Sequence, residues 1–317
     1  VAVKIVKGAQ KYTDTALDEI KLLGVIREKQ NASRHVIQML GHFRLRGPNG
    51  EHVCMVMEVM GPNLLRLMRL FGMEGLPTGV VRKVARQVLK GLDFLHRKCG
   101  IIHTDIKPEN IFLRLRKLEL SELAAETPTH GAARKNRDTL EIENIEVVIG
   151  DLGNACWVDE KFAVEIQTRH YRAPEVILDA GYSTQCDIWS VGCVVFELLT
   201  GHFLFSPKER PGCSKDEDHI AQIMSRTGET MASLSHGKKY NAMFRSRREM
   251  RNRKTDKIVT VETVLERKHN FNPLAARDIA AFLVQVLAVD PRRRASARRC
   301  LLQSPWLEVI GDSDNAE

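Results

Sequence analysis

The densest group of side chains that could do chemistry lies in the run His103–Asn110 (HTDIKPEN). This run holds a carboxylate in Asp105, an ammonium group in Lys107 and a carboxamide in Asn110. A carboxylate can orient a hydroxyl group and accept its proton, a lysine can neutralise a phosphate in transfer, and an amide oxygen can hold a magnesium ion. The alternative is that Asp105 and Asn110 only cap a turn. The three groups at this spacing favour phosphoryl transfer to a hydroxyl group.

A second acidic position follows later in the chain, in the segment Val147–Gly153 (VVIGDLG). Its β-branched residues predict a strand, and the Asp151-Leu152-Gly153 sequence predicts a sharp turn at the end of that strand. Such a turn would deliver the Asp151 carboxylate to a magnesium–nucleotide site. Alone, Asp-x-Gly is a common turn sequence, but its place after the run 103–110 favours the functional interpretation.

The elements that must position these residues fall into a β-rich part followed by a helical part. The segment Val1–Val6 alternates like a strand buried on one side, and Thr13–Thr15 offers N-cap oxygens to a helix that runs through Val25. Two further strands are predicted at 35–43 and 52–58. Long amphipathic helices are predicted near 79–98, 187–200, 216–226 and 274–288.

This order predicts an α+β fold of two lobes, with a boundary near residues 58–61. The stretch 114–146 interrupts the order, because it is charged and lacks sustained periodicity. We interpret it as an insertion with a short helix near 115–125.

The net charge of +8 suggests nucleic-acid binding. However, the run 245–254 (RSRREMRNRK) carries six bases and one acid, and the run 292–299 (RRRASARR) carries five bases. Since these two runs together exceed the charge of the whole chain, we expect solvated faces or structural ion pairs. An RNA-binding protein is the alternative, but no RRM-like aromatic motif is present and aromatic residues make up only 6%. We therefore expect no direct contact with nucleic acid.

The cysteines and the apolar runs indicate in which cellular compartment we expect the protein. The seven cysteines are odd in number and never form CxxC, which argues against a disulfide framework or a zinc site. Reduced thiols are typical of cytoplasmic and nuclear proteins. No apolar run approaches the roughly 20 residues of a membrane span. We expect no membrane association.

Taken together, the motifs resemble those of eukaryotic protein kinases. The run His103–Asn110 is similar to the catalytic loop, Asp151–Gly153 stands where kinases usually have Asp-Phe-Gly, and Thr168–Glu175 (TRHYRAPE) is similar to the end of the activation segment. The sequence Val1–Lys4 (VAVK) resembles the strand whose lysine pairs with a helix glutamate, here Glu19. Alone, these two residues would be a solvated lysine and a surface glutamate.

Finer features resemble the SR-protein kinases, which act on serine/arginine-rich splicing factors. The similar stretches are TALDEIKLL (15–23), CMVMEVMGPNLL (54–65), HTDIKPEN (103–110), DLGNACW (151–157), IQTR (166–169) and DEDHIA (216–221). The insertion 114–146 falls where that family carries its spacer. A LAMMER-type kinase is the alternative within the group, although no LAMMER-like stretch stands at 216–224. A non-catalytic pseudokinase scaffold is a further alternative. The presence of Lys4, Asp105, Asn110 and Asp151, which catalysis would need, argues against it.

The resemblance implies an ATP-dependent serine/threonine kinase that uses Mg²⁺ and regulates mRNA splicing. We expect the protein to be a monomer. It implies catalytic roles for Lys4, Glu19, Asp105, Lys107 and Asn110. The magnesium ligands would be Asn110 and Asp151, and the nucleotide pocket would include Ala2, Lys4, Glu58, Met60, Phe112 and Asp151.

Several scaffold roles and one regulatory property are also implied. Glu175 would pair with Arg294, and Asp187 would brace the backbone of the catalytic loop. Asp218 would be an acidic docking position, with Ser225 where a second acid is usual. Thr104 replaces the arginine that pairs with a phosphorylated activation loop in most kinases, which predicts activity without that phosphorylation.

The expected division is a kinase N-lobe at 1–60, a C-lobe at 61–309 with the insertion 114–146, and a tail at 310–317. Kinases place two strands and a glycine-rich loop before the VAxK strand, whereas here nothing precedes Val1. We therefore expect an N-lobe that lacks its first two strands, and weak ATP binding and catalysis by this chain alone.

Overall fold

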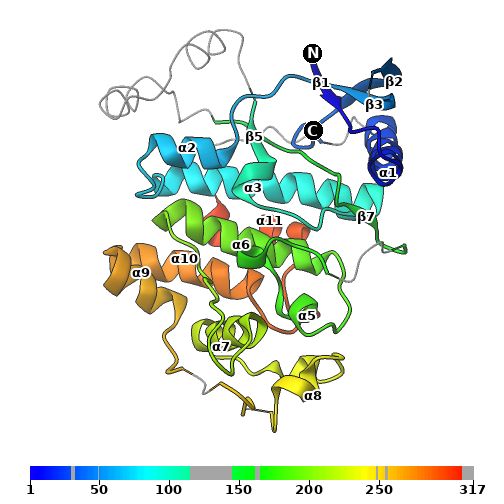
Figure 1. Cartoon of the computed structure of the whole chain (residues 1–317). Helices are drawn as coiled ribbons and strands as arrows, with labels where there is room; N and C mark the ends of the chain where they lie inside the picture. The colour runs from blue at the N-terminus through cyan, green and yellow to red at the C-terminus, as the bar shows by residue number, and fades with distance from the viewer. Residues whose placement is uncertain are drawn as a thin grey trace.

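The computed structural model of the chain describes residues 1–29, 33–48, 50–114, 145–160, 165–247, 249–253 and 256–308. A small sheet with one long helix lies at one end, and the rest is largely helical (Figure 1). This is the mixed α+β architecture that the sequence predicts. The helix predicted near 115–125 and the tail 310–317 lie outside the described residues.

The small sheet contains the antiparallel strands β1 (Ala2–Ile5), β3 (Gly50–Met57) and β2 (Met39–Gly47), in that spatial order. The register places Lys4 opposite Met55. Helix α1 (Gln10–Glu28) buries an apolar stripe that includes Leu22, Leu23 and Ile26. The residues of α1 and the central strand β3 thus form the core of this end of the molecule.

Two expectations about this region are wrong in detail. All four residues of β1 are exposed, with Val3 at 47% and Ile5 at 59%, because β1 is an edge strand that pairs only with β3. Helix α1 begins earlier than predicted, after Ala9. The Thr15 hydroxyl does not cap the helix but donates back to the Lys11 carbonyl at 2.9 Å, as hydroxyls inside helices do.

The helical body surrounds α6 (Gln185–Thr200), whose residues from Cys186 to Thr200 are all buried. A helix that is apolar on all sides belongs in a protein core. Among the described residues, the other α-helices are α2 (Leu64–Leu70), α3 (Thr78–Phe94), α5 (Pro174–Ile177), α7 (Lys215–Thr227), α8 (Tyr240–Met243), α9 (Val261–His269), α10 (Pro273–Val286) and α11 (Ala297–Gln303). Within the described part of the chain, no helix combines the length and apolar character needed to cross a membrane.

Two small antiparallel sheets of two strands each flank the run 103–110 at the end of the body nearest the three-stranded sheet. Strand β4 (Ile101–Ile102) pairs with β7 (Cys156–Trp157), and β5 (Ile111–Leu113) pairs with β6 (Val147–Ile149). The run 103–110 is therefore fixed at both ends. Asp151 follows β6 after Gly150, where a side chain would come within 2.9 Å of the Phe112 ring.

Candidate active site

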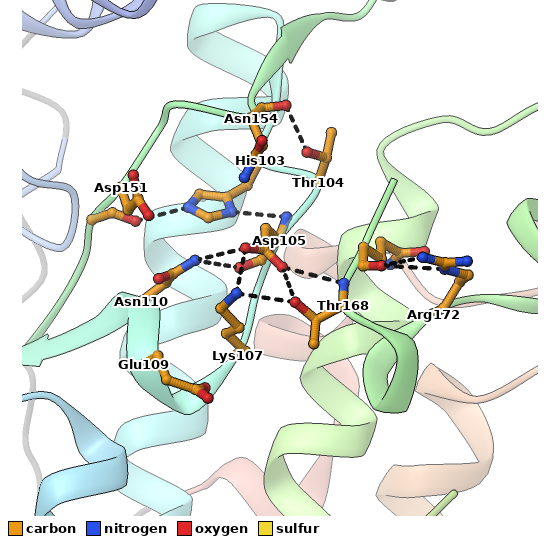
Figure 2. A network of polar contacts seen from close by, with 12 residues as sticks. His103, Thr104, Asp105, Lys107, Glu109, Asn110, Asp151, Asn154, Thr168 and Arg172 are labelled. Carbon is orange, nitrogen blue, oxygen red and sulfur yellow. Dashed lines mark hydrogen bonds and ion pairs between the residues drawn. The ribbon is translucent and has the colours of Figure 1, made fainter. Parts of the chain in front are cut away.

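Three residues of the run 103–110, Asp105, Lys107 and Asn110, form a compact polar network with Thr168 (Figure 2). We call these four residues the loop cluster. Lys107 Nζ lies 2.7 Å from Asp105 Oδ2, and Asn110 Nδ2 donates to the Asp105 carbonyl at 2.9 Å and to Oδ2 at 3.2 Å. The Thr168 hydroxyl donates to Asp105 Oδ1 at 2.7 Å and accepts from Lys107 Nζ at 3.0 Å. Both carboxylate oxygens of Asp105 are therefore held.

These contacts set the charge of Asp105. The residue is only 7% exposed, and burial alone would raise its pKa. The hydrogen bonds from Lys107 and Thr168 outweigh burial and hold the pKa of Asp105 below its usual value. Asp105 is thus an ionised carboxylate near neutral pH.

The backbone of the run is braced from below by Asp187, as predicted. The main-chain N–H groups of His103 and Thr104 donate to the two carboxylate oxygens of Asp187, at 2.9 and 2.8 Å. Thr104 has φ 66°, a left-handed conformation that is unfavourable for a β-branched residue. Its hydroxyl donates to the Asn154 carbonyl at 2.7 Å, which ties the run to the segment after Asp151.

A second group, the sheet cluster, consists of Lys4, Glu19 and Asp151. Lys4 Nζ lies 2.9 and 2.8 Å from the two carboxylate oxygens of Glu19, and 3.5 Å from Asp151 Oδ1. Burial would lower the pKa of Lys4, but the negative charges of Glu19 and Asp151 outweigh it and raise that pKa. The predicted Lys4–Glu19 contact is confirmed. The Lys4 ammonium group also points toward the carboxylate of Asp151, which follows β6.

Gly150 joins the two clusters. Its N–H donates to the Asn110 carbonyl at 2.9 Å, and its carbonyl lies 3.0 Å from His103 Nε2. Asp151 itself has φ 57°, a left-handed conformation that an Asp tolerates better than most residues. Lys4, Asp151 and the run that holds Asp105 and Asn110, far apart in sequence, are thus brought to one region.

The oxygens available there suit a hard cation. The side-chain amide nitrogen of Asn110 donates to Asp105, and its Oδ1 accepts no hydrogen bond from any described residue. The side chain of Asp151 is 45% exposed. Among the described residues no group of three or more His, Cys, Asp or Glu could hold a metal. Two protein oxygens with phosphate and water as the remaining ligands is the arrangement that Mg²⁺ favours.

The predicted nucleotide-pocket residues come from several elements: Ala2 and Lys4 lie on β1, Glu58 and Met60 follow β3, and Phe112 lies on β5. Ala2 pairs with Met57, and Phe112 lies on β5 opposite Val148. The Glu58 side chain accepts hydrogen bonds from the Gln38 N–H at 3.1 Å and from Arg114 at 3.0 Å, so its carboxylate fixes the connection. The main-chain N–H of Met60 and carbonyl of Glu58 show no main-chain hydrogen bond to a described residue.

A pocket of about 360 Å³ opens beside the loop cluster. One side is formed by Thr104, Asp105, Lys107 and Asn154, and the other by residues 165–168. Our sequence interpretation did not assign a role to Thr168, which stands in this wall and contacts Asp105. Only its place in the TRHYRAPE motif could have drawn attention to it.

Our sequence interpretation also assigned no role to two acidic residues that follow Lys107 in the chain, Glu109 and Glu197. Glu197 on α6 is 2% exposed, accepts a hydrogen bond from the Tyr171 hydroxyl at 2.6 Å and has no cationic partner among the described residues. Burial, together with the charge of Glu109, raises the pKa of Glu197 to about 7. Glu109 has a buried Oε2 atom without a hydrogen-bond partner. The one sequence signal for Glu197 is that it is the single charged residue in the apolar run 191–199, and our interpretation did not use that signal.

The other predicted scaffold contact is confirmed. Arg294 donates to both oxygens of Glu175, at 2.7 and 2.9 Å, and both side chains are at most 1% exposed. Arg294 also donates to the Ala288 carbonyl at 2.9 Å, so the buried charge pair is well hydrogen-bonded. This pair fixes the segment after Thr168 to the helical body.

The docking role expected for Asp218 does not fit the geometry. Asp218 is fully buried, and its carboxylate accepts hydrogen bonds from the Lys208 N–H at 3.0 Å, Gln222 at 2.8 Å and Arg253 at 3.2 Å. All of these partners belong to the same chain. Asp218 therefore stabilises the loops around α7 and is not free to receive a substrate.

Comparison with known proteins agrees with this site. Residues 1–307 match the family model described as "Protein kinase domain". The chain is 38% identical to "Serine/threonine-protein kinase SRPK" of Physarum polycephalum, over 98% of this chain and 80% of that protein. It is 32% identical to "Protein kinase dsk1" of Schizosaccharomyces pombe over 98% of this chain and 76% of that protein, and 31% identical to "SRSF protein kinase 3" of Homo sapiens over 97% and 81%. The chain therefore belongs to the protein kinase family, and within it to the SR-protein kinases.

Proposed function

We propose that this protein transfers the γ-phosphoryl group of ATP to serine residues of Arg-Ser-rich splicing factors and thereby regulates mRNA splicing. The observation that carries the proposal is the ionised, immobilised Asp105 carboxylate in the wall of an open pocket, 2.7 Å from Lys107. The names of the relatives support the substrate class.

In the proposed reaction Asp105 orients the serine hydroxyl and accepts its proton. Lys107 lies on the same side and neutralises negative charge on the phosphoryl group as it moves toward the serine oxygen. Lys4, held by Glu19, contacts the phosphates that stay with the nucleotide. Asn110 and Asp151 would hold Mg²⁺, which neutralises the phosphate oxygens when bound.

The nucleotide base would lie against the connection between the two lobes, which we place at 1–60 and 61–309. The main-chain groups of Glu58 and Met60 are available there as an acceptor and a donor. Ala2 and Phe112 would supply apolar contacts on either side of the base. The Glu58 side chain is engaged with Gln38 and Arg114, so only its backbone could take part.

The acidic residues Glu109 and Glu197 support a preference for arginine. Each is at least partly buried, the charge of one raises the pKa of the other, and neither has a cation among the described residues. An arginine of the substrate would relieve this repulsion, because a guanidinium group can pair with two carboxylates.

The proposal includes turnover without phosphorylation of the activation segment. Where a charged pair would be needed, Thr104 forms a neutral hydrogen bond to Asn154. Arg172 donates to the Gln167 carbonyl at 2.8 Å, so it is already engaged. We further propose a monomer that acts in the cytoplasm and the nucleus. All seven cysteines lie within the described residues, are buried and are not joined in disulfides, as expected for reduced thiols.

A radiolabelled-ATP assay tests this function. The purified protein, with and without prior phosphatase treatment, is offered an Arg-Ser repeat peptide and a matched Lys-Ser peptide. We expect Mg²⁺-dependent labelling of the Arg-Ser peptide that the phosphatase leaves unchanged. Equal labelling of both peptides would refute the substrate assignment, and loss of turnover after dephosphorylation would refute the independence from phosphorylation.

A further inference from the structure

A short loop after α8 presents a serine between two arginines. Phe244 and Met250, which are 3% and 5% exposed, form an antiparallel bridge at its base. The Arg245 N–H donates to the Glu249 carbonyl at 2.8 Å, which closes the loop above the bridge. The described tip residues Arg245, Ser246 and Arg247 are all exposed. The loop is thus anchored by apolar burial and leaves its polar tip in solvent.

The Ser246 hydroxyl is free to react. It makes no side-chain hydrogen bond to any described residue, so modification would break none of the described side-chain hydrogen bonds. Ser246 is also the one serine in the full sequence with an arginine on both sides. The sequence Arg-Ser-Arg matches the substrate class proposed above.

Two other serines precede an arginine in this chain, and the structure treats them differently. Ser225 is 2% exposed, and its hydroxyl donates to the Lys257 carbonyl at 2.7 Å. Ser33 accepts a hydrogen bond from the His35 N–H at 3.2 Å, next to a buried histidine. Both hydroxyls therefore have structural roles, whereas that of Ser246 bonds to no described residue.

The charges around the tip complement the acidic residues near the loop cluster. Arg245 is 59% exposed and lies 3.7 Å from Glu249, itself 62% exposed, so this ion pair is weak and easily exchanged. Arg245 and Arg247 could instead turn to carboxylates of an enzyme. Glu109 and Glu197, which lack a cation among the described residues, are such carboxylates.

We propose that Ser246 is a phosphorylation site and that a second copy of this kinase modifies it. The inference rests on the proposed function. The loop follows α8, which lies at the opposite end of the molecule from the small sheet and well away from β5, next to the loop cluster (Figure 1). The chain cannot bring Ser246 to its own Asp105 without unfolding the Phe244–Met250 anchor, so the reaction occurs between two molecules.

In this step the Ser246 oxygen forms a bond to the γ-phosphorus of ATP, the bond from that phosphorus to the β–γ bridging oxygen breaks, and ADP leaves. The hydroxyl proton passes to Asp105 of the modifying copy and then to water. The product places a phosphate with about two negative charges beside Arg245 and Arg247. This phosphate would compete with Glu249 for Arg245.

The test uses an epitope-tagged, catalytically inactive Asp105→Asn protein as the substrate of the untagged wild-type protein, with Mg²⁺ and ATP. Phosphate on the tagged protein is located by mass spectrometry. We expect labelling at Ser246, at least a tenfold loss of label in the tagged double variant with Ser246→Ala, and no loss with Ser33→Ala. For the wild-type protein alone, the rate per molecule should double when its concentration is doubled.

An Arg-Ser peptide in the same reaction separates the two proposals. If the peptide is labelled and Ser246 is not, the inference about Ser246 is wrong and the proposed function stands. If neither is labelled, both are wrong. A rate per molecule that does not depend on concentration would overturn the reaction between copies, and label that persists in the Ser246→Ala protein would overturn the site.

Discussion

The loop cluster and the sheet cluster carry charges of similar kind but are built in different ways. In the loop cluster Asp105 is 7% exposed and has a partner on each carboxylate oxygen, all within the helical body. In the sheet cluster only Glu19 is buried, whereas Lys4 and Asp151 are 44% and 45% exposed. The first is organised before any substrate arrives, and the second depends on one ion pair between β1 and α1.

This difference indicates a division of labour. A preorganised carboxylate costs no rearrangement during reaction, which suits the step in which a proton moves. Lys4 is half-exposed, so a nucleotide can reach it and leave again, and Glu19 on α1 holds its ammonium group in place. We therefore expect the loop cluster to control kcat and the sheet cluster to control the KM for ATP.

The largest effect should come from Asp105→Asn. The amide keeps the shape but cannot accept the serine proton, so kcat should fall about 10²–10⁴-fold. The melting temperature should change little, because Thr168 and Asn110 still have a polar neighbour. The control is Asp93→Asn, which among the described residues removes the ion pair with Arg97, just after α3. A kcat within threefold of wild type would refute the role of Asp105.

The second test uses pH to separate Asp105 from Glu197. Burial and Glu109 raise the pKa of Glu197 to about 7, so it loses its negative charge as the pH falls below 7, while Asp105 stays ionised. The KM for an Arg-Ser peptide should therefore rise about tenfold from pH 8 to pH 6, since one unit below the pKa leaves about a tenth of the groups charged.

In Glu197→Gln the KM should be high throughout and the pH dependence should vanish, with kcat nearly unchanged. A wild-type KM that stays flat from pH 8 to pH 6 would remove Glu197 from substrate binding.

The third test addresses the sheet cluster through Glu19→Gln. Lys4 loses a charged partner but, at 44% exposed, is partly compensated by water. We expect the KM for ATP to rise about tenfold, or about 1.4 kcal/mol, with a smaller change in kcat. Asp18→Asn, on the same helix and paired only with Lys21, is the matched control. Equal effects of the two substitutions would show that the Lys4 contact is not responsible.

The smallest effect should come from Thr168→Ala. It removes the hydroxyl that joins Asp105 to Lys107, but these two residues still contact each other at 2.7 Å. A net loss of about 1 kcal/mol predicts a roughly fivefold fall in kcat. Thr168→Ser should restore the rate, because it keeps the hydroxyl. No recovery in the serine variant would mean that packing of the methyl group, rather than the hydrogen bond, is what matters.

Much of the fold followed from the sequence, because helix and strand periodicities are local. The helices at 78–94, 185–200, 215–227 and 273–286 lie close to their predicted positions. The start of α1 could not be predicted, since Thr15 could use its hydroxyl either to cap a helix or to bond back to Lys11. The exposure of β1 could not be predicted either, because an alternating pattern does not reveal which face another element covers.

The sequence by itself determined the chemical groups of the site and their local presentation. Asp105, Lys107 and Asn110 stand in one run, and Asp151 follows a short strand, so their types and spacing are properties of short segments. Only the tertiary structure decided that Thr168, 63 residues away, completes the Asp105 network and that burial raises the pKa of Glu197 to about 7. It also decided that the carboxylate of Asp218 is buried and bonded to residues around α7. Burial and pairing depend on every element that packs around a side chain, and no short stretch of sequence contains that information.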